Sequence, residues 1–283
     1  MKEKLTPFQR HERIHGFLFG KKPKRRLFNF EIHLNDECNL SCRGCFHFAP
    51  LVHGKSPYPI DEFAADLKRI GEIFHGKFGW VHLLGGEPLL NENVIRYLDI
   101  ARQHIKKGTV DLVTNGLLLP KMKEDFFEAC RRNHIRVAIT RYPIPLDYDK
   151  LLSLVRAHGC EGYVFGDRTA SDSFSLPALD PKSKTSSKRN YLHCILANAC
   201  VTLDHGKLTY CSLPGYVRLF NDAFGHTFDD EGDWISIYGH NKKEILDFLR
   251  TPHPFCRYCD LEKRLNNPIP WSKSEGKKEE WLS

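Results

Sequence analysis

The sequence predicts an α/β fold built on a parallel sheet. Between residues 28 and 165, short apolar runs alternate with amphipathic stretches, and this alternation is typical of parallel strands joined by crossover helices. A chain of 283 residues with 41% hydrophobic residues can bury a substantial core. Residues 166–189 are rich in Ser, Asp, Pro and Lys and predict a linker, after which the composition changes.

The expected strands are short apolar runs of strand length. They are residues 28–34, 80–84, 110–114, 136–140 and 162–165. The stretches between them have helical periodicity, and they predict helices at residues 61–74, 94–105, 121–133 and 148–158. In α/β proteins built on parallel strands, the carboxyl ends of the strands carry the chemistry. Residues that directly follow a strand are therefore the candidates for a site.

The second half of the chain predicts a smaller α+β unit. Residues 199–203 and 207–210 flank Asp204-His205-Gly206, which is a hairpin signal, and residues 242–250 predict a helix. The polar segment 272–280 is expected to fray. The expected organisation is a basic lead-in at residues 1–26, an α/β unit at 27–189, the smaller unit at 190–265 and a polar tail at 266–283.

Three cysteines lie directly after the first expected strand. Cys38, Cys42 and Cys45 occur in CNLSCRGC, with three and then two intervening residues. This spacing lets one loop offer thiolates to three irons of a four-iron cluster, and it leaves the fourth iron without a protein ligand. A structural zinc site is the alternative, with His47 as the fourth ligand.

Two further motifs follow the second and third expected strands. Gly-Gly-Glu-Pro occupies residues 85–88, and Val-Thr-Asn-Gly occupies residues 113–116. Paired glycines let the backbone approach a ligand closely, and proline fixes the turn that follows. Each motif alone is a turn signal more often than a site. Because both motifs follow the three cysteines in this order, a functional site is favoured over two unrelated turns.

Together these motifs resemble those of the radical SAM superfamily. The resemblance implies a partial (β/α)6 TIM-like barrel, with S-adenosylmethionine (SAM) bound to the open iron of a [4Fe-4S] cluster and cleaved to a 5′-deoxyadenosyl radical. It also implies that the residues of the second motif hold the methionine amino group, namely Gly85, Gly86, Glu87 and Pro88. Asn115 then contacts the nucleoside or its ribose.

Two details of the SAM site rest on position in the chain. Thr140 and Arg141 end the fourth expected strand, and we expect ribose or carboxylate contacts from them; the alternative is a strand end with a surface arginine. The family commonly has an aromatic residue directly before the third cysteine, where this chain has Gly44. Phe46 or the backbone is then expected to contact adenine.

The carboxyl-terminal part of the chain holds five more closely grouped cysteines. Two bracket the expected hairpin, and a CxxC pair follows the expected helix, an arrangement that resembles the twitch variant of the SPASM domain. The resemblance implies a second, auxiliary [4Fe-4S] cluster in a small twitch-type domain, held by Cys194, Cys211, Cys256 and Cys259. Structural zinc on the same thiols is the alternative.

The remaining cysteines have simpler interpretations. Cys200 is the second candidate for the first auxiliary ligand, and as a free thiol it is also a candidate hydrogen donor to a substrate radical. Cys130 shares an apolar helix face with two phenylalanines and predicts buried packing, as does Cys160.

Charge and composition narrow the compartment and the partners. The formal net charge is +7, and the basic residues at 21–26 predict a solvated lead-in, with a phosphate-bearing substrate as the alternative. Nucleic acid is not expected, because the basic residues are not interleaved with a reading element. No apolar run is long enough for a membrane span. The amino terminus is too charged for a secretory signal, and the cysteine spacing indicates a reducing cytoplasm.

The expected function is that of a radical SAM oxidoreductase or epimerase. The phrase CRGCFHFAPL resembles radical SAM proteins found with surface-polysaccharide biosynthesis, and the short amino terminus leaves no room for a leader-peptide-binding domain. We therefore expect dehydrogenation or epimerisation of a small polyhydroxylated substrate such as a sugar, nucleotide sugar or aminocyclitol, with flavodoxin or ferredoxin as the reducing partner. A peptide maturase with a separate recognition protein and an activase or electron-transfer protein are the alternatives.

Overall fold

One mixed sheet organises the molecule. The computed structural model describes residues 28–165, 175–197 and 199–283. Within them eight strands form a single sheet in the order β5-β4-β3-β2-β1-β6-β7-β8. The strands are β1 (Phe28–His33), β2 (Lys77–Leu84), β3 (Lys107–Thr114), β4 (Ile135–Thr140), β5 (Gly162–Phe165), β6 (Thr202–Asp204), β7 (Lys207–Thr209) and β8 (Trp234–Ser236).

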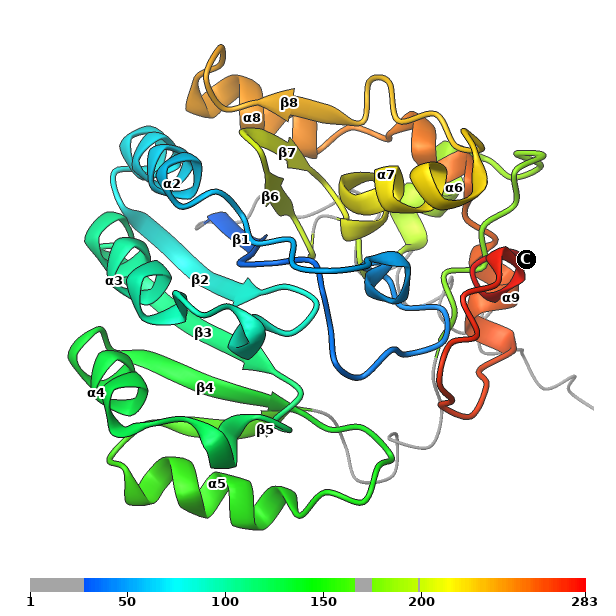
Figure 1. Cartoon of the computed structure of the whole chain (residues 1–283). Helices are drawn as coiled ribbons and strands as arrows, with labels where there is room; N and C mark the ends of the chain where they lie inside the picture. The colour runs from blue at the N-terminus through cyan, green and yellow to red at the C-terminus, as the bar shows by residue number, and fades with distance from the viewer. Residues whose placement is uncertain (1–27, 166–174, 198) are drawn as a thin grey trace, which may run out of the picture.

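Helices alternate with the first five strands, as the sequence predicts. They are α2 (Ile60–Phe74), α3 (Val94–His104), α4 (Glu124–Arg132) and α5 (Tyr148–Ala157). Strands β1 to β5 are mutually parallel and adjacent in chain order, and the four helices lie along the outer side of the sheet (Figure 1). The α/β fold with a partial barrel is confirmed. The strand arrows point toward the loop after β1 and toward the carboxyl-terminal segment (Figure 1).

Helix α2 and strand β1 bury the apolar residues that predict them. Helix α2 turns Phe63, Leu67 and Ile70 into the core, where all three are fully buried. The central strand β1 is buried over most of its length, which explains its nearly continuous apolar run. Strand β2 begins three residues before its predicted start and β3 also begins three residues early, because polar or glycine residues at their starts lack an apolar pattern.

The carboxyl-terminal strands continue the same sheet. Strand β6 pairs in parallel with β1, and β7 and β8 follow in antiparallel order. The expected hairpin joins β6 and β7, and its two central residues both have positive φ, 46° at His205 and 71° at Gly206. This is the geometry of a tight two-residue hairpin turn. The two expected units therefore share one sheet.

One long helix escaped the sequence prediction. Helix α7 (Ser212–Phe224) carries Pro214 and Gly215 in its first turn, a pair that reads as a turn in sequence. Proline is tolerated there because the first turn lacks intrahelical N–H partners. The remaining helices are α6 (Ser187–His193), α8 (Lys242–Leu249) and α9 (Leu261–Asn266). Of these, α8 was predicted.

The polar tail is ordered, so the expectation that it frays is wrong. Ser272 and Ser274 exchange backbone hydrogen bonds with the cysteine loop, and Trp281 is fully buried. The buried Trp281 side chain and the backbone bonds to the cysteine loop hold the polar residues that lie between these contacts. The basic lead-in at residues 1–26 lies outside the described residues, and so do residues 166–174 of the linker.

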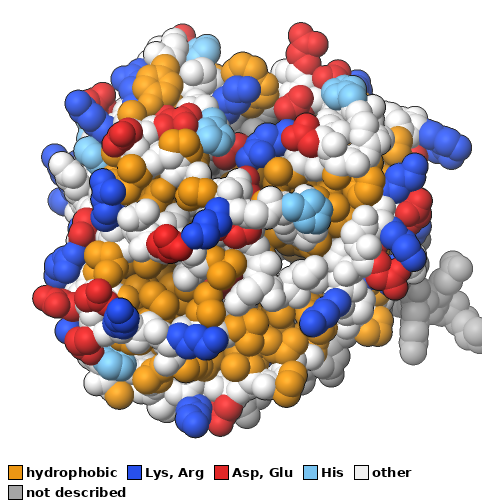
Figure 2. Space-filling view, in the orientation of Figure 1, with side chains coloured by type: hydrophobic (Ala, Val, Ile, Leu, Met, Phe, Trp, Pro, Cys, Tyr) orange, Lys and Arg blue, Asp and Glu red, His pale blue; other side chains and the backbone are white. Residues whose placement is uncertain are grey.

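Two surface properties bear on partners. On the face in Figure 2, basic and acidic side chains are interspersed. None of the helices within the described part of the chain has the length and hydropathy to cross a membrane.

Candidate active site

A cavity of about 140 Å³ lies at the carboxyl edge of the parallel strands. It brings together predicted residues from the ends of β1, β2, β3 and β4. These are Cys38, Cys42, Cys45, Gly85, Gly86, Asn115 and Thr140. Residues up to 102 positions apart in the chain thus meet at one place, as expected for the chemistry-bearing edge of such a sheet.

The three cysteines lie on one tight loop after β1. Cys45 N donates to the Cys42 carbonyl at 3.2 Å, so the loop turns back on itself between the thiols. Burial raises the pKa of Cys38 and of Cys42 to about 12 and also raises the pKa of Cys45. Thiols with such pKa values stay protonated near neutral pH unless a metal binds them. One buried and two half-buried thiols on one cavity fit a cluster with one open position.

Cluster ligands need a wider arrangement than the ligands of a single ion, because each thiolate binds a separate iron. Among the residues that the structure describes, no three His, Cys, Asp or Glu side chains converge on a point that one metal ion could occupy.

The glycine pair makes room for protein as well as for a ligand. A methyl group at Gly85 would overlap the Asn35 carbonyl, and one at Gly86 would overlap the Glu37 carbonyl. Gly86 N donates to the Asn35 carbonyl at 2.9 Å. Glycine is therefore required where the turn after β2 packs against the start of the cysteine loop. This reason is independent of any bound group.

Glu87 is turned into the protein. It is fully buried, and its carboxylate accepts hydrogen bonds from the Thr114 hydroxyl at 2.6 Å and from Asn115 N at 2.8 Å. Burial raises the pKa of Glu87 to about 7, despite these donors. The Glu87 side chain thus links the Gly-Gly-Glu-Pro turn to the Val-Thr-Asn-Gly turn. Glu87, Pro88 and Arg141 are not among the residues that line the described cavity.

Residues at the carboxyl ends of β3 and β4 complete the wall of the cavity. Asn115 Nδ2 donates to Asn39 at 2.7 Å and lies 3.9 Å from Cys38 Sγ. Thr140 lines the cavity, whereas the Arg141 guanidinium stacks on the Tyr148 ring at 4.5 Å. The two residues that were predicted together therefore separate in the structure.

Tyr142 and His47 are two of the cavity residues that were not predicted as ligand contacts. Tyr142 lies beside the three cysteines, and burial, with their charges, raises its pKa well above the usual range. The sequence signal for Tyr142 was its position two residues after Thr140, at the end of the fourth expected strand. His47 also lines the cavity, and its Nε2 lies 3.8 Å from the buried Glu31 carboxylate. From the sequence, His47 was expected only as the fourth ligand of the alternative zinc site.

The missing aromatic residue before Cys45 has a steric explanation. Gly44 has φ of 62°, and a methyl group there would overlap Leu176 and lie 2.8 Å from the Glu280 carbonyl. Phe46 packs against the hydrophobic core. Tyr142 is thus an aromatic side chain on the cavity wall, contributed by a different strand end.

A second, smaller cavity brings the four expected auxiliary cysteines together. It is lined by Cys194, Cys211, Cys256 and Cys259. Cys200 lines neither this cavity nor the first and lies just before β6. Cys130 and Cys160 are buried away from both cavities, as the packing interpretation expects.

A buried arginine accompanies these four cysteines. Arg264 is 4% exposed, and its Nη2 donates to Cys194 Sγ at 3.1 Å. Burial alone would raise the pKa of Cys194, but the adjacent Arg264 guanidinium lowers it below the usual range. A buried guanidinium needs an anionic partner. The site therefore fits thiolates, the form that a cluster or a zinc ion would bind.

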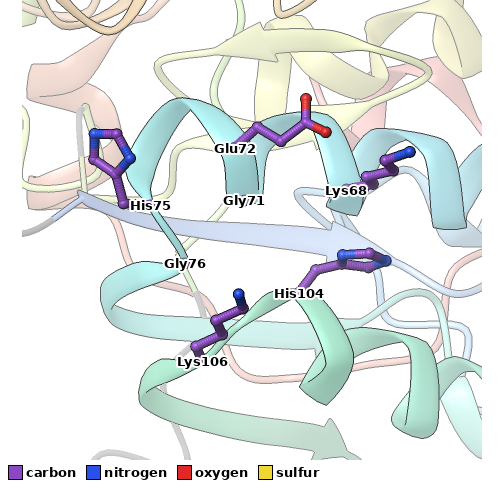
Figure 3. Close-up of a pocket in the computed structure, with 7 residues that line it drawn as sticks. All are labelled: Lys68, Gly71, Glu72, His75, Gly76, His104 and Lys106. Atoms are coloured by element: carbon purple, nitrogen blue, oxygen red, sulfur yellow. The ribbon is translucent and has the colours of Figure 1, made fainter.

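Another cavity, of about 430 Å³, lies at the opposite end of the sheet. Figure 3 shows its side chains at the end of α2 and at the junction of α3 and β3, including His75, His104 and Lys106. Despite its larger volume it is at the amino edge of the strands and contains no cysteine. We therefore assign the chemistry to the smaller cavity.

Known proteins resemble parts of this chain. A GTP 3′,8-cyclase from Synechocystis sp. is 31% identical over 97 residues, which are 34% of this chain and 29% of the relative. A GTP 3′,8-cyclase from Clostridium perfringens is 31% identical over 103 residues, 35% of this chain and 31% of the relative. The match thus spans about a third of each relative's length. No protein-family model matches the chain.

The fold has a wider match. The solved structure of native anSMEcpe with bound AdoMet superposes with a TM-score of 0.50 at 13% identity, covering 86% of this chain and 89% of that one. Fold and site together define an α/β protein with a three-cysteine loop at the carboxyl edge of its parallel strands. The chain is thus similar in sequence to GTP 3′,8-cyclases over about a third of its length, and similar in fold to anSMEcpe over most of its length.

Proposed function

We propose that this chain cleaves SAM reductively and dehydrogenates a small polyhydroxylated substrate. The observation that carries the proposal is the cavity where Cys38, Cys42 and Cys45 meet the ends of three further strands. A cluster with one open iron and bound SAM would supply a 5′-deoxyadenosyl radical there, able to remove hydrogen from an unactivated carbon.

The chain's own residues then bind and orient SAM. In this proposal the backbone at Gly85 and Gly86 holds the methionine amino group, and Asn115 and Thr140 contact the nucleoside. Tyr142 takes the adenine contact, because its ring lines the cavity while Phe46 packs in the core. The hydroxyl of Tyr142 stays protonated and can donate a hydrogen bond, since burial raises its pKa.

The polar wall supports a substrate with many hydroxyl groups. Ser41, His47 and Tyr142 line the cavity with groups that donate and accept hydrogen bonds. Such groups discriminate strongly in favour of a substrate that pairs with them, because they are left unpaired otherwise. Sugars, nucleotide sugars and aminocyclitols have this chemistry.

The four auxiliary cysteines favour dehydrogenation. A carbinol carbon that has lost a hydrogen atom must lose one proton and one further electron to become a ketone. A cluster on Cys194, Cys211, Cys256 and Cys259 would supply the electron acceptor. Flavodoxin or ferredoxin is the proposed reductant for the SAM-binding cluster.

The test is substrate-dependent SAM cleavage by anaerobically reconstituted protein. We expect one candidate polyol to stimulate 5′-deoxyadenosine formation and to yield a ketone lighter by two hydrogens, one product per 5′-deoxyadenosine. Deuterium at the oxidised carbon should appear in 5′-deoxyadenosine. A product of unchanged composition that takes deuterium from D2O would instead mean epimerisation. Stimulation by peptides alone would contradict the proposed substrate class.

A further inference from the structure

The last thirteen residues form a strap across the cysteine loop. This C-terminal strap, residues 271–283, pairs with the loop through Arg43 N to the Ser272 carbonyl and Ser274 N to the Ser41 carbonyl, both at 2.9 Å. Cys42 and Lys273 form an antiparallel bridge between these bonds. The loop that carries all three thiols is thus held by residues more than two hundred positions away.

One side chain of the strap reaches a sulfur. The indole Nε1 of Trp271 donates to Cys42 Sγ at 3.2 Å. Cys42 is 7% exposed, so water competes little for this sulfur. The second tryptophan of the strap, Trp281, donates its Nε1 to the Cys45 carbonyl at 2.8 Å. The two tryptophans of the strap therefore make one contact with a thiol and one with a backbone carbonyl.

We propose that Trp271 raises the reduction potential of the SAM-binding cluster by donating this hydrogen bond to Cys42. The inference rests on the proposed function, in which Cys42 binds an iron. Reduction adds an electron to a cluster whose thiolates already carry negative charge, and an N–H aimed at a thiolate stabilises the reduced form more than the oxidised form. Trp271 is a positioning residue that acts through Cys42.

The geometry separates this role from simple support of the loop. The backbone bonds of Ser272 and Ser274 hold the loop whichever side chain stands at position 271. Trp271 is only half-buried, so its replacement by Phe leaves no large cavity. Trp271→Phe keeps an aromatic ring and removes the N–H. It should fold and retain iron.

The experiment is a redox titration followed by electron paramagnetic resonance on the reconstituted full chain. The signal that changes on SAM addition reports the SAM-binding cluster. We expect Trp271→Phe to lower its midpoint potential, so that the ratio of reduced to oxidised cluster at a fixed potential falls about tenfold, or about 59 mV for one electron. Iron per chain should match the wild type.

Trp234→Phe is the matched control. Trp234 lies on β8 with its ring over Lys207, and its loss should leave the midpoint unchanged. An unchanged midpoint in Trp271→Phe at full iron content would overturn the inference while leaving the proposed function intact. Iron loss in Trp271→Phe alone would also overturn it, because Trp271 would then hold the loop. A wild type that takes up no cluster would contradict both.

Discussion

The buried residue Arg264 requires negative charge at the carboxyl-terminal cysteine site. A guanidinium that is 4% exposed, with its Nη2 on the Cys194 sulfur, is stable only beside negative charge. We predict that Arg264→Met reduces the iron retained after reconstitution from about eight to about four per chain. Iron analysis with Mössbauer spectra measures this.

Arg257→Met is the matched control for that change. Arg257 lies in the same region but its side chain is 40% exposed, so its loss should leave the iron content unchanged and alter stability by about 0.5 kcal/mol or less. Full iron in Arg264→Met would mean that the cation does not compensate a cluster.

Tyr142 tests the proposed adenine contact. Stacking of a base on an aromatic ring contributes about 1–3 kcal/mol, and about 1.4 kcal/mol corresponds to tenfold in affinity. We predict that Tyr142→Ala weakens SAM binding about tenfold, while Tyr142→Phe keeps the ring and binds nearly as the wild type does. Equilibrium binding of SAM distinguishes the two. Equal affinities for the Ala and Phe variants would remove Tyr142 from the adenine site.

At the residue scale, sequence alone groups residues that a local motif holds together. Cys38, Cys42 and Cys45 lie within eight residues of the chain, and the structure brings them to one cavity. Trp271 contacts Cys42 across 229 positions, and no local pattern announces such a contact. Arg141 was chosen by adjacency to Thr140, but successive residues at a strand end point in different directions.

At the scale of elements, a single buried carboxylate joins four neighbouring strands. Asp111 on β3 accepts from Arg136 on β4 at 2.7 Å and from Tyr163 on β5 at 3.0 Å, and it lies 3.5 Å from His82 on β2. Burial alone would raise the pKa of Asp111, but His82 and Arg136 outweigh it and lower the pKa to about 2. The charged form therefore stabilises the sheet.

The sign of this shift fixes its pH dependence. Because the folded pKa of Asp111 lies below the usual aspartate value of 3.8, its contribution is complete above that value and is lost only as the pH falls toward about 2. We predict that Asp111→Asn lowers the free energy of unfolding by about 2 kcal/mol, with the same difference at pH 8 and pH 9. Anaerobic urea unfolding at both values measures it.

Asp99→Asn controls for loss of an exposed charge. Asp99 also pairs with arginine, Arg132 at 2.7 Å, but its side chain is 43% exposed. Surface pairs of this kind contribute about 0–1 kcal/mol, so this variant should unfold nearly as the wild type does. A difference between Asp111→Asn and wild type that grows from pH 8 to pH 9 would contradict the assigned pKa shift.

Elements with a strong periodic pattern were predicted to within a few residues. Helix α5 matches closely because it buries a regular apolar stripe. Strand β5 matches because its short apolar run pairs with β4, although none of its residues is fully buried. Helix α7 was missed because Pro214 and Gly215 imitate a turn. The C-terminal strap was missed because its order comes from Trp281 and from backbone pairing with a distant loop, neither of which alters its polar composition.

At the scale of the whole molecule, one sheet connects the first cysteine loop to the auxiliary cysteine Cys211, which follows β7. Strand β1 leads into the first cysteine loop and pairs with β6, which begins the hairpin next to the auxiliary cysteines. The sequence predicted two units because its composition changes after the linker. It did not predict that β6 to β8 extend the first sheet, since strand pairing across such a separation leaves no local pattern.

The central claim is that the first cavity cleaves SAM. The most direct measurement is the rate of 5′-deoxyadenosine formation from SAM under a strong reductant, for the wild type and for the Cys38/Cys42/Cys45 triple-alanine variant. We predict formation by the wild type and none by the variant, which should keep about four irons on its auxiliary cysteines. Equal rates from the two proteins would contradict the account.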